Sequence, residues 1–172
     1  MNKTADAASE HVPDPGARRH HQVQAWSFVT GQFILLAVLV LAPFRGPPQA
    51  TTVLTIVGYV LSALSLIGVG VAASALGRGL TASPLPNQAA RLRTGGLYAW
   101  VRHPIYSFVL LFGLGRVISF PTATTIFTLV ILLALLTGKA GWEERRLKER
   151  FAGYADYARR TPRFMPRRIG RR

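Results

Sequence analysis

The chain has no cysteine and few acidic residues, only seven among 172. The absence of cysteine excludes disulfides, thiolate metal sites and cysteine nucleophiles. Charged residues make up only 16% of the chain, whereas 49% of it is hydrophobic, which is too apolar for the surface of an ordinary soluble domain. We therefore predict that part of this chain is embedded in the lipid bilayer.

Positive charge predominates, with 21 Lys and Arg residues and a net charge of +14. In a soluble protein such an excess would suggest nucleic acid, but here the basic residues lie beside apolar runs, where anionic lipid headgroups attract them. We therefore expect membrane lipids as partners, and neither nucleic acid nor a metal.

Apolar length and helix breakers predict an all-α integral membrane protein with about four transmembrane helices, near 24–42, 51–76, 104–120 and 121–141. The last two form one apolar stretch that is too long for a single crossing, so Ser119-Phe120-Pro121-Thr122 is predicted to fold it into a hairpin. Residues 1–22 are too polar to order themselves and are expected to be a disordered tail. Residues 23–172 then form one membrane domain, in which 142–166 make a cytoplasmic amphipathic helical cap.

Topology follows from the positions of Lys and Arg. They precede the first apolar segment, lie between the second and third, and are most numerous at and after the end of the fourth, whereas the other two connections carry only Arg45 and Arg116. By the positive-inside rule both termini and the central loop are cytoplasmic, with the bacterial inner membrane as the expected location. All seven acidic residues fall on that side.

Two polar clusters are predicted to meet at this cytoplasmic face. Arg102 and His103 begin the third membrane helix, with Tyr106 one turn further on, and Glu143-Glu144 end the fourth. Carboxylates at a helix C-terminus face the negative end of its dipole, so a cation should compensate them. That cation is either a ligand or the adjacent Arg145 and Arg146; in the second case the aromatic residues of the first cluster only mark the membrane interface.

The second half of the chain resembles the isoprenylcysteine carboxyl methyltransferase family and its phospholipid methyltransferase relatives. The resemblance is carried by Gly96 to Tyr106 (GLYAWVRHPIY), Glu143-Glu144-Arg145-Arg146-Leu147, Phe151, Tyr154, Tyr157 and Arg163-Phe164-Met165-Pro166. It implies an integral membrane enzyme that binds S-adenosylmethionine beneath a C-terminal cap.

The resemblance and the chemistry of the cofactor together give the expected site. The ammonium and sulfonium would face carboxylates, the cofactor's carboxylate would face a guanidinium, and the adenine would lie against aromatic or aliphatic walls. The expected cofactor-binding residues are Leu97, Tyr98, Val101, Arg102, His103, Tyr106, Glu143 and Glu144. Arg102, His103 and Glu144 are the expected catalytic residues, and Tyr157 and Arg163 are expected to contact the substrate.

The methyl acceptor stays open between a prenylated protein cysteine, phosphatidylethanolamine, another lipid amine and a hydrophobic carboxylate. Two other functions are alternatives to the methyltransferase. A membrane reductase of the steroid and sterol type also has a histidine-proline-x-tyrosine stretch and uses NADPH, but its usual residue after the proline is asparagine, where this chain has Ile105. A non-catalytic membrane scaffold is the third hypothesis.

Overall fold

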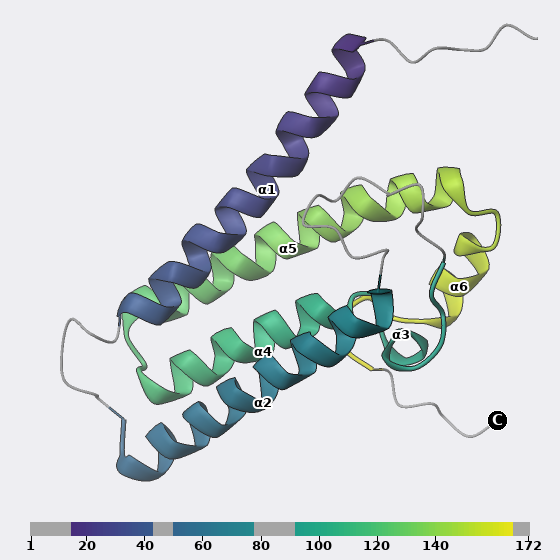
Figure 1. The fold of residues 1–172 in the computed structure, drawn as a ribbon. Coiled ribbons are helices and arrows are strands. Elements are labelled where there is room, and N and C mark those ends of the chain that lie inside the picture. Colours follow the sequence, from purple (N-terminus) through teal and green to yellow (C-terminus); the bar gives the residue numbers. More distant parts are fainter. Residues whose placement is uncertain (1–14, 43–49, 78–91, 167–172) are drawn as a thin grey trace, which may run out of the picture.

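The structure, a computed structural model, describes residues 15–42, 50–77 and 92–166, with side chains from Gln22 onward. Within these ranges all regular structure is helical. The helices are, in order, α1 (Pro15–Leu41), α2 (Thr52–Leu76), α3 (Leu97–Trp100), α4 (Pro104–Ser119), α5 (Ala123–Arg150) and α6 (Tyr154–Arg160). The prediction of an all-helical chain is confirmed (Figure 1).

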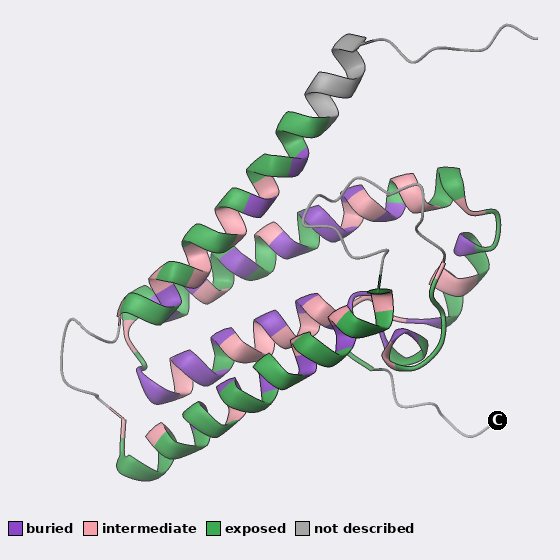
Figure 2. Cartoon of the chain, in the orientation of Figure 1, coloured by how far each residue is buried: buried purple, intermediate pink, exposed green. Residues whose placement is uncertain are grey.

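Three helices are long and apolar enough to cross a membrane: Gln22–Leu41 within α1, α2, and α5. The chain therefore has the character of a multi-span membrane protein. Large apolar side chains lie exposed along these helices, as in α2, where Val53 is 69% and Ile67 is 64% exposed (Figure 2). The fourth predicted span, α4, is apolar but has only 16 residues, or about 24 Å at about 1.5 Å per residue.

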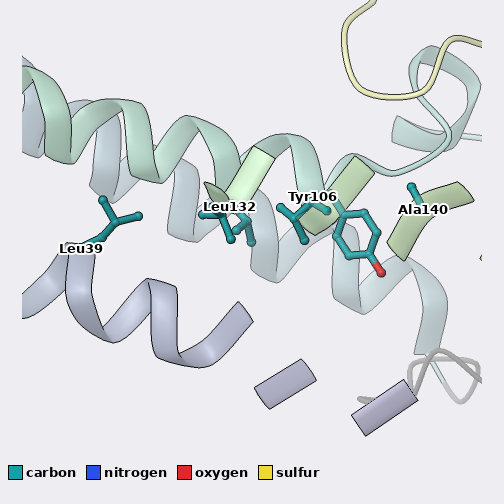
Figure 3. Close-up of a cluster of buried hydrophobic side chains, with 6 residues drawn as sticks. Leu39, Tyr106, Leu132 and Ala140 are labelled. Carbon is teal, nitrogen blue, oxygen red and sulfur yellow. The ribbon is translucent and has the colours of Figure 1, made fainter. Parts of the chain in front are cut away.

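The long helices form two antiparallel pairs. In the first pair α1 lies along α5, where Trp142 Nε1 donates a hydrogen bond to Gln24 Oε1 and Lys139 Nζ donates one to Gln32 Oε1. In the second pair α2 lies along α4 (Figure 1). The two pairs share a core where α1, α4 and α5 meet, made of Leu39, Tyr106, Val109, Leu132, Leu136 and Ala140 (Figure 3).

Small residues allow α2 and α4 to approach closely. A Cβ added to Gly115 would lie 2.6 Å from the carbonyl oxygen of Gly58, and one added to Gly58 would collide with Ser119. Because lipid gives no hydrophobic drive between helices, such close backbone packing is a principal source of their association. In the sequence, the four-residue spacing of Gly58 and Ser62, and again of Gly70 and Ser74, predicts such packing.

The hairpin between α4 and α5 turns where the sequence predicts it. Helix α4 ends at Ser119, and Thr122 caps α5 by a reciprocal pair of hydrogen bonds with Thr125. Arg116 closes this end of the bundle: its Nε donates to the carbonyl of Leu39 at 3.2 Å, and its guanidinium lies 5.2 Å from the ring centroid of Phe120.

Two predicted boundaries differ from the structure, and one short helix was not predicted. Helix α1 begins at Pro15, so part of the expected tail 1–22 is helical, because extending a formed helix costs little per residue. Residues 1–14 lie outside the described residues, as do Arg45, Arg78 and Arg91. Helix α5 continues through the expected boundary at 142 to Arg150, because this segment contains no proline and its charged residues are good helix formers. The cap is thus a short α6 and an irregular segment, and the single turn α3 was not predicted.

The predicted site residues lie at one end of the bundle, opposite the hairpin between α4 and α5. There the C-terminal part of α5, α3, α6 and the start of α4 gather (Figure 1). We call this the polar end.

Candidate functional site

His103 lies at the centre of the polar end. It is the N-cap residue of α4, and Pro104 follows it as the first helical residue, where a missing N–H costs nothing. Its Nε2 lies 3.1 Å from Glu144 Oε1, and its Nδ1 lies 3.7 Å from Glu143 Oε2. The ring stacks on that of Tyr106, with centroids 5.2 Å apart and planes 1° apart. The two predicted clusters, 41 residues apart, do meet.

Glu144 is held by three side chains of the chain itself. Arg163 binds it in a bidentate manner, with Nε 3.0 Å from Oε1 and Nη2 2.8 Å from Oε2. Arg102 Nη2 lies 3.3 Å from Oε1, the same oxygen that contacts His103. The cations that compensate this carboxylate are therefore Arg102 and Arg163, from distant segments.

Glu143 is in a different situation. Its Oε1 accepts a hydrogen bond of 2.6 Å from the Tyr106 hydroxyl. Its Oε2 is 3.7 Å from His103 Nδ1, which is beyond hydrogen-bond distance, and has no closer donor among the described side chains. The side chain remains 17% exposed. One oxygen of Glu143 is thus able to accept a further donor.

The C-terminal segment 161–166, which we call the strap, closes over this cluster. The backbone N–H of Arg102 donates to the carbonyl of Pro162 at 2.9 Å, and that of His103 donates to the carbonyl of Arg163 at 3.1 Å. Ser107 Oγ donates to the carbonyl of Phe164 at 2.7 Å. The hydrogen bonds to Glu144 raise the pKa of Arg163, so the strap carries a permanent charge into the site.

Tyr98 and Tyr157 join three elements beside the cluster. The Tyr157 hydroxyl donates to the carbonyl of Tyr98 at 2.5 Å, and the Tyr98 hydroxyl donates to the carbonyl of Ala72 in α2 at 3.3 Å. Burial raises the pKa of Tyr157 to about 12 and raises that of Tyr98 as well, so both hydroxyls remain donors. Val101 is also buried, whereas Leu97 is half-buried. Tyr98 and Tyr157 thus connect α2, α3 and α6 by hydrogen bonds. The expected cofactor-binding roles of Leu97, Tyr98 and Val101 and the expected substrate contact of Tyr157 stay predictions.

Two polar residues of the site were missed from the sequence. Lys139 is 5% exposed, and its Nζ donates to Gln32 Oε1 at 3.0 Å and lies 5.1 Å from the centroid of the Tyr106 ring. The sequence does mark Lys139, because it is a lysine inside an apolar run, one turn before Glu143. Ionisable residues within membrane helices often belong to functional sites. Gln32 gave no comparable signal.

The cluster is not arranged as a metal centre. The carboxylates of Glu143 and Glu144 face different ring nitrogens of His103, and both oxygens of Glu144 are bound by arginine. Across the parts of the chain that the structure describes, no group of three or more His, Cys, Asp and Glu residues could hold a metal ion.

Comparison with known proteins gives the family. The model of a family described as a protein of unknown function, DUF1295, matches residues 10–161. The chain belongs to the DUF1295 family. The resemblance to the isoprenylcysteine carboxyl methyltransferases was therefore wrong as a family assignment. Short segments in the second half of the chain carried it, whereas the family model matches residues 10–161.

Two curated relatives carry names that refer to metal resistance. The chain is 29% identical to the nickel-cobalt-cadmium resistance protein NccN of Alcaligenes xylosoxydans xylosoxydans over 151 residues, which are 86% of this chain and 65% of that protein. It is 38% identical to the cobalt-zinc-cadmium resistance protein CzcN of Cupriavidus metallidurans over 78 residues, which are 44% of this chain and 36% of that protein. The matched part of the chain thus spans less than two thirds of either relative.

Proposed function

We propose that this member of the DUF1295 family is an integral membrane methyltransferase that uses S-adenosylmethionine and acts on a lipidic or otherwise hydrophobic acceptor. The observation that supports it most is the Oε2 of Glu143, which has no hydrogen-bond donor closer than His103 Nδ1 at 3.7 Å, in a buried cluster that also contains guanidinium groups. A zwitterionic amino-acid group needs a carboxylate for its ammonium and a guanidinium for its own carboxylate. The cluster offers both within one end of an apolar bundle.

The two glutamates take different roles in this proposal. Glu143 binds the cationic part of the cofactor, because it keeps an acceptor oxygen and is 17% exposed. Glu144 is a positioning residue, because its oxygens are bound by Arg163, Arg102 and His103. It holds the strap and the start of α4 in register around Glu143.

When bound, the cofactor supplies an activated methyl group for in-line transfer, so the chain's residues have to bind and orient rather than attack. Correct orientation is worth up to about 7–11 kcal/mol in well-aligned systems. For an amine acceptor, His103 or Glu143 would keep the amine neutral by accepting its proton. For a carboxylate acceptor no base is needed, and an arginine such as Arg163 would orient it.

We further propose that α4 is a fourth crossing and that the polar end faces the cytoplasm. The hairpin at Thr122 and the antiparallel pairing put the described N-terminal end of α1, the start of α4 and the end of α5 at the same end of the bundle. At about 24 Å, α4 would cross only where the bilayer is locally thin or where its neighbours shield its ends. An apolar acceptor would then reach the cluster sideways from the bilayer.

The names of the two relatives refer to metal resistance. For this chain we keep the methyltransferase proposal, because His103 Nε2 contacts Glu144 and both oxygens of Glu144 are bound by Arg163.

A calorimetric titration of the detergent-purified chain tests the proposal. S-adenosylmethionine and S-adenosylhomocysteine should bind, and NADPH should not. Binding of NADPH alone would replace the transferase by the reductase, and binding of none of the three would favour the scaffold.

The variant Glu143→Gln localises the cofactor site. Gln keeps an oxygen for the Tyr106 hydroxyl but removes the charge, so affinity for S-adenosylmethionine should fall about 10- to 100-fold, as expected for a charged hydrogen bond. The exposed Glu149→Gln on the same helix removes the same charge and serves as the control. Equal affinities for all three proteins would remove Glu143 from the site.

A further inference from the structure

A second polar feature adjoins the cluster and shares Arg102 and Arg163 with it. It is a pocket of about 340 Å³ between the end of α6 and the strap. Four arginines line it, together with Ala158, Thr161 and Pro162: Arg102, Arg159, Arg160 and Arg163. A pocket with so many guanidinium groups and no carboxylate in its lining is built for an anion.

The positive charge of this arginine pocket is only partly neutralised. Glu144 pairs with Arg102 and Arg163, and Asp156 pairs with Arg159. Among the described residues no carboxylate pairs with Arg160. Four guanidinium groups thus face two carboxylates, which leaves two positive charges in excess.

The donors are also not used up. Arg102 Nε is buried and has no hydrogen-bond partner among the described residues. A buried donor without a partner is costly, and because this nitrogen is closed to solvent it adds to the positive charge of the pocket wall without contacting a ligand directly. The carbonyl of Ala158, which would repel an anion, already accepts from Arg102 Nη1 at 3.2 Å. The pocket therefore presents N–H groups more than oxygens.

The location of the arginine pocket indicates which anion it meets. The guanidinium of Arg146 lies 3.3 Å from the ring centroid of Trp142 on α5, an aromatic and basic pairing typical of the membrane interface. The arginine pocket lies at this same polar end, where lipid phosphates are concentrated. Guanidinium forks match phosphate oxygens in a bidentate manner.

We propose that the arginine pocket is a binding site for a phosphate group, and that its natural source is the headgroup of an anionic phospholipid. A bound headgroup would neutralise the excess charge and tie α6 and the strap to the bilayer surface. Arg102 and Arg163 are shared with the His103 cluster, but the test does not depend on the proposed methyl transfer, because it alters only Arg159 and Arg160, which lie outside that cluster.

The test compares two charge-matched double variants of the full chain in detergent. Arg159→Gln with Arg160→Gln changes the pocket, whereas Arg145→Gln with Lys148→Gln removes two positive charges from exposed positions of α5. Each protein is titrated with short-chain phosphatidylglycerol, short-chain phosphatidylcholine and inorganic phosphate, after circular dichroism has shown unchanged helicity.

Phosphatidylglycerol should bind the unaltered chain and the α5 variant alike, and the pocket variant should lose about tenfold or more in affinity. Inorganic phosphate with the same arginine dependence would support the site and assign it to free phosphate as well. Equal losses in both double variants would overturn the proposal, because a diffuse charge would then explain the result. Equal binding of phosphatidylcholine and phosphatidylglycerol that is unchanged in the pocket variant would also overturn it, because detergent partitioning would then explain the result.

Discussion

Glu143 and Glu144 are adjacent in the chain but have different environments. Neighbouring residues on an α-helix point about 100° apart. One carboxylate therefore meets Tyr106 on α4, and the other meets Arg163 on the strap. The sequence predicted that both lie near His103, and they do. It could not predict which was already paired, because Arg163 reaches Glu144 only through the fold of the strap.

The substitution Glu144→Gln should destabilise the protein more than it alters chemistry. It leaves Arg163 and the largely buried Arg102 without their counter-charge, at a cost of about 1.5–3 kcal/mol for lost charged hydrogen bonds. We expect a lower melting temperature in detergent and faster tryptic cleavage at Arg163. The exposed Glu149→Gln should melt like the unaltered chain. Indistinguishable melting of both variants would show that the ion pairs do not hold the strap.

Lys139 is a site residue whose sequence context was informative. A lysine between apolar neighbours in a membrane segment is costly unless it is paired. The partner, Gln32, lies 107 residues away on α1, and only the packing of α1 on α5 brings it to 3.0 Å. The presence of the charge was thus predictable, and its partner was not.

At the scale of elements, helix lengths followed from local breakers. The hairpin before α5 was predictable because Pro121 and Thr122 act locally, whereas the end of α5 was misplaced because a change from apolar to charged residues was taken for a helix end. Charged residues such as Glu and Lys are good helix formers. A continuous α5 of 28 residues is about 42 Å long, so it projects beyond about 30 Å of hydrocarbon and carries its carboxylates to the polar end.

Small residues on α2 were predicted as two pairs, and one pair was right. Gly58 and Ser62 are buried against α4, but Gly70 and Ser74 are exposed, and Gly68 instead accommodates the Phe108 ring. The spacing of small residues does not say which face of a helix meets a neighbour. That depends on the partner's side chains.

The glycine contact between α2 and α4 gives a test at this scale. Gly115→Val would place a side chain against the carbonyl of Gly58 and Ser62 Oγ, so the two helices must separate. Overpacking of this kind costs about 1–3 kcal/mol, seen as a lower melting temperature. Gly70→Ala meets nothing within 4 Å and should leave the melting temperature unchanged or slightly raise it. A Gly115→Val protein as stable as the control would show that the helices do not pack closely.

At the scale of the whole molecule, one polar end gathers the cluster, the strap and the arginine pocket. The chain has no cysteine, so a single introduced cysteine reports the side of the membrane on which it lies. Ala123→Cys lies at the start of α5, by the hairpin, and Asp156→Cys lies on α6 at the polar end; both positions are exposed. If the polar end is cytoplasmic, a membrane-impermeant maleimide should label only Ala123→Cys in intact cells, and Asp156→Cys only after lysis. The reverse pattern would place the cluster outside the cytoplasm, away from any cytoplasmic S-adenosylmethionine, and would contradict both the topology and the proposed enzyme.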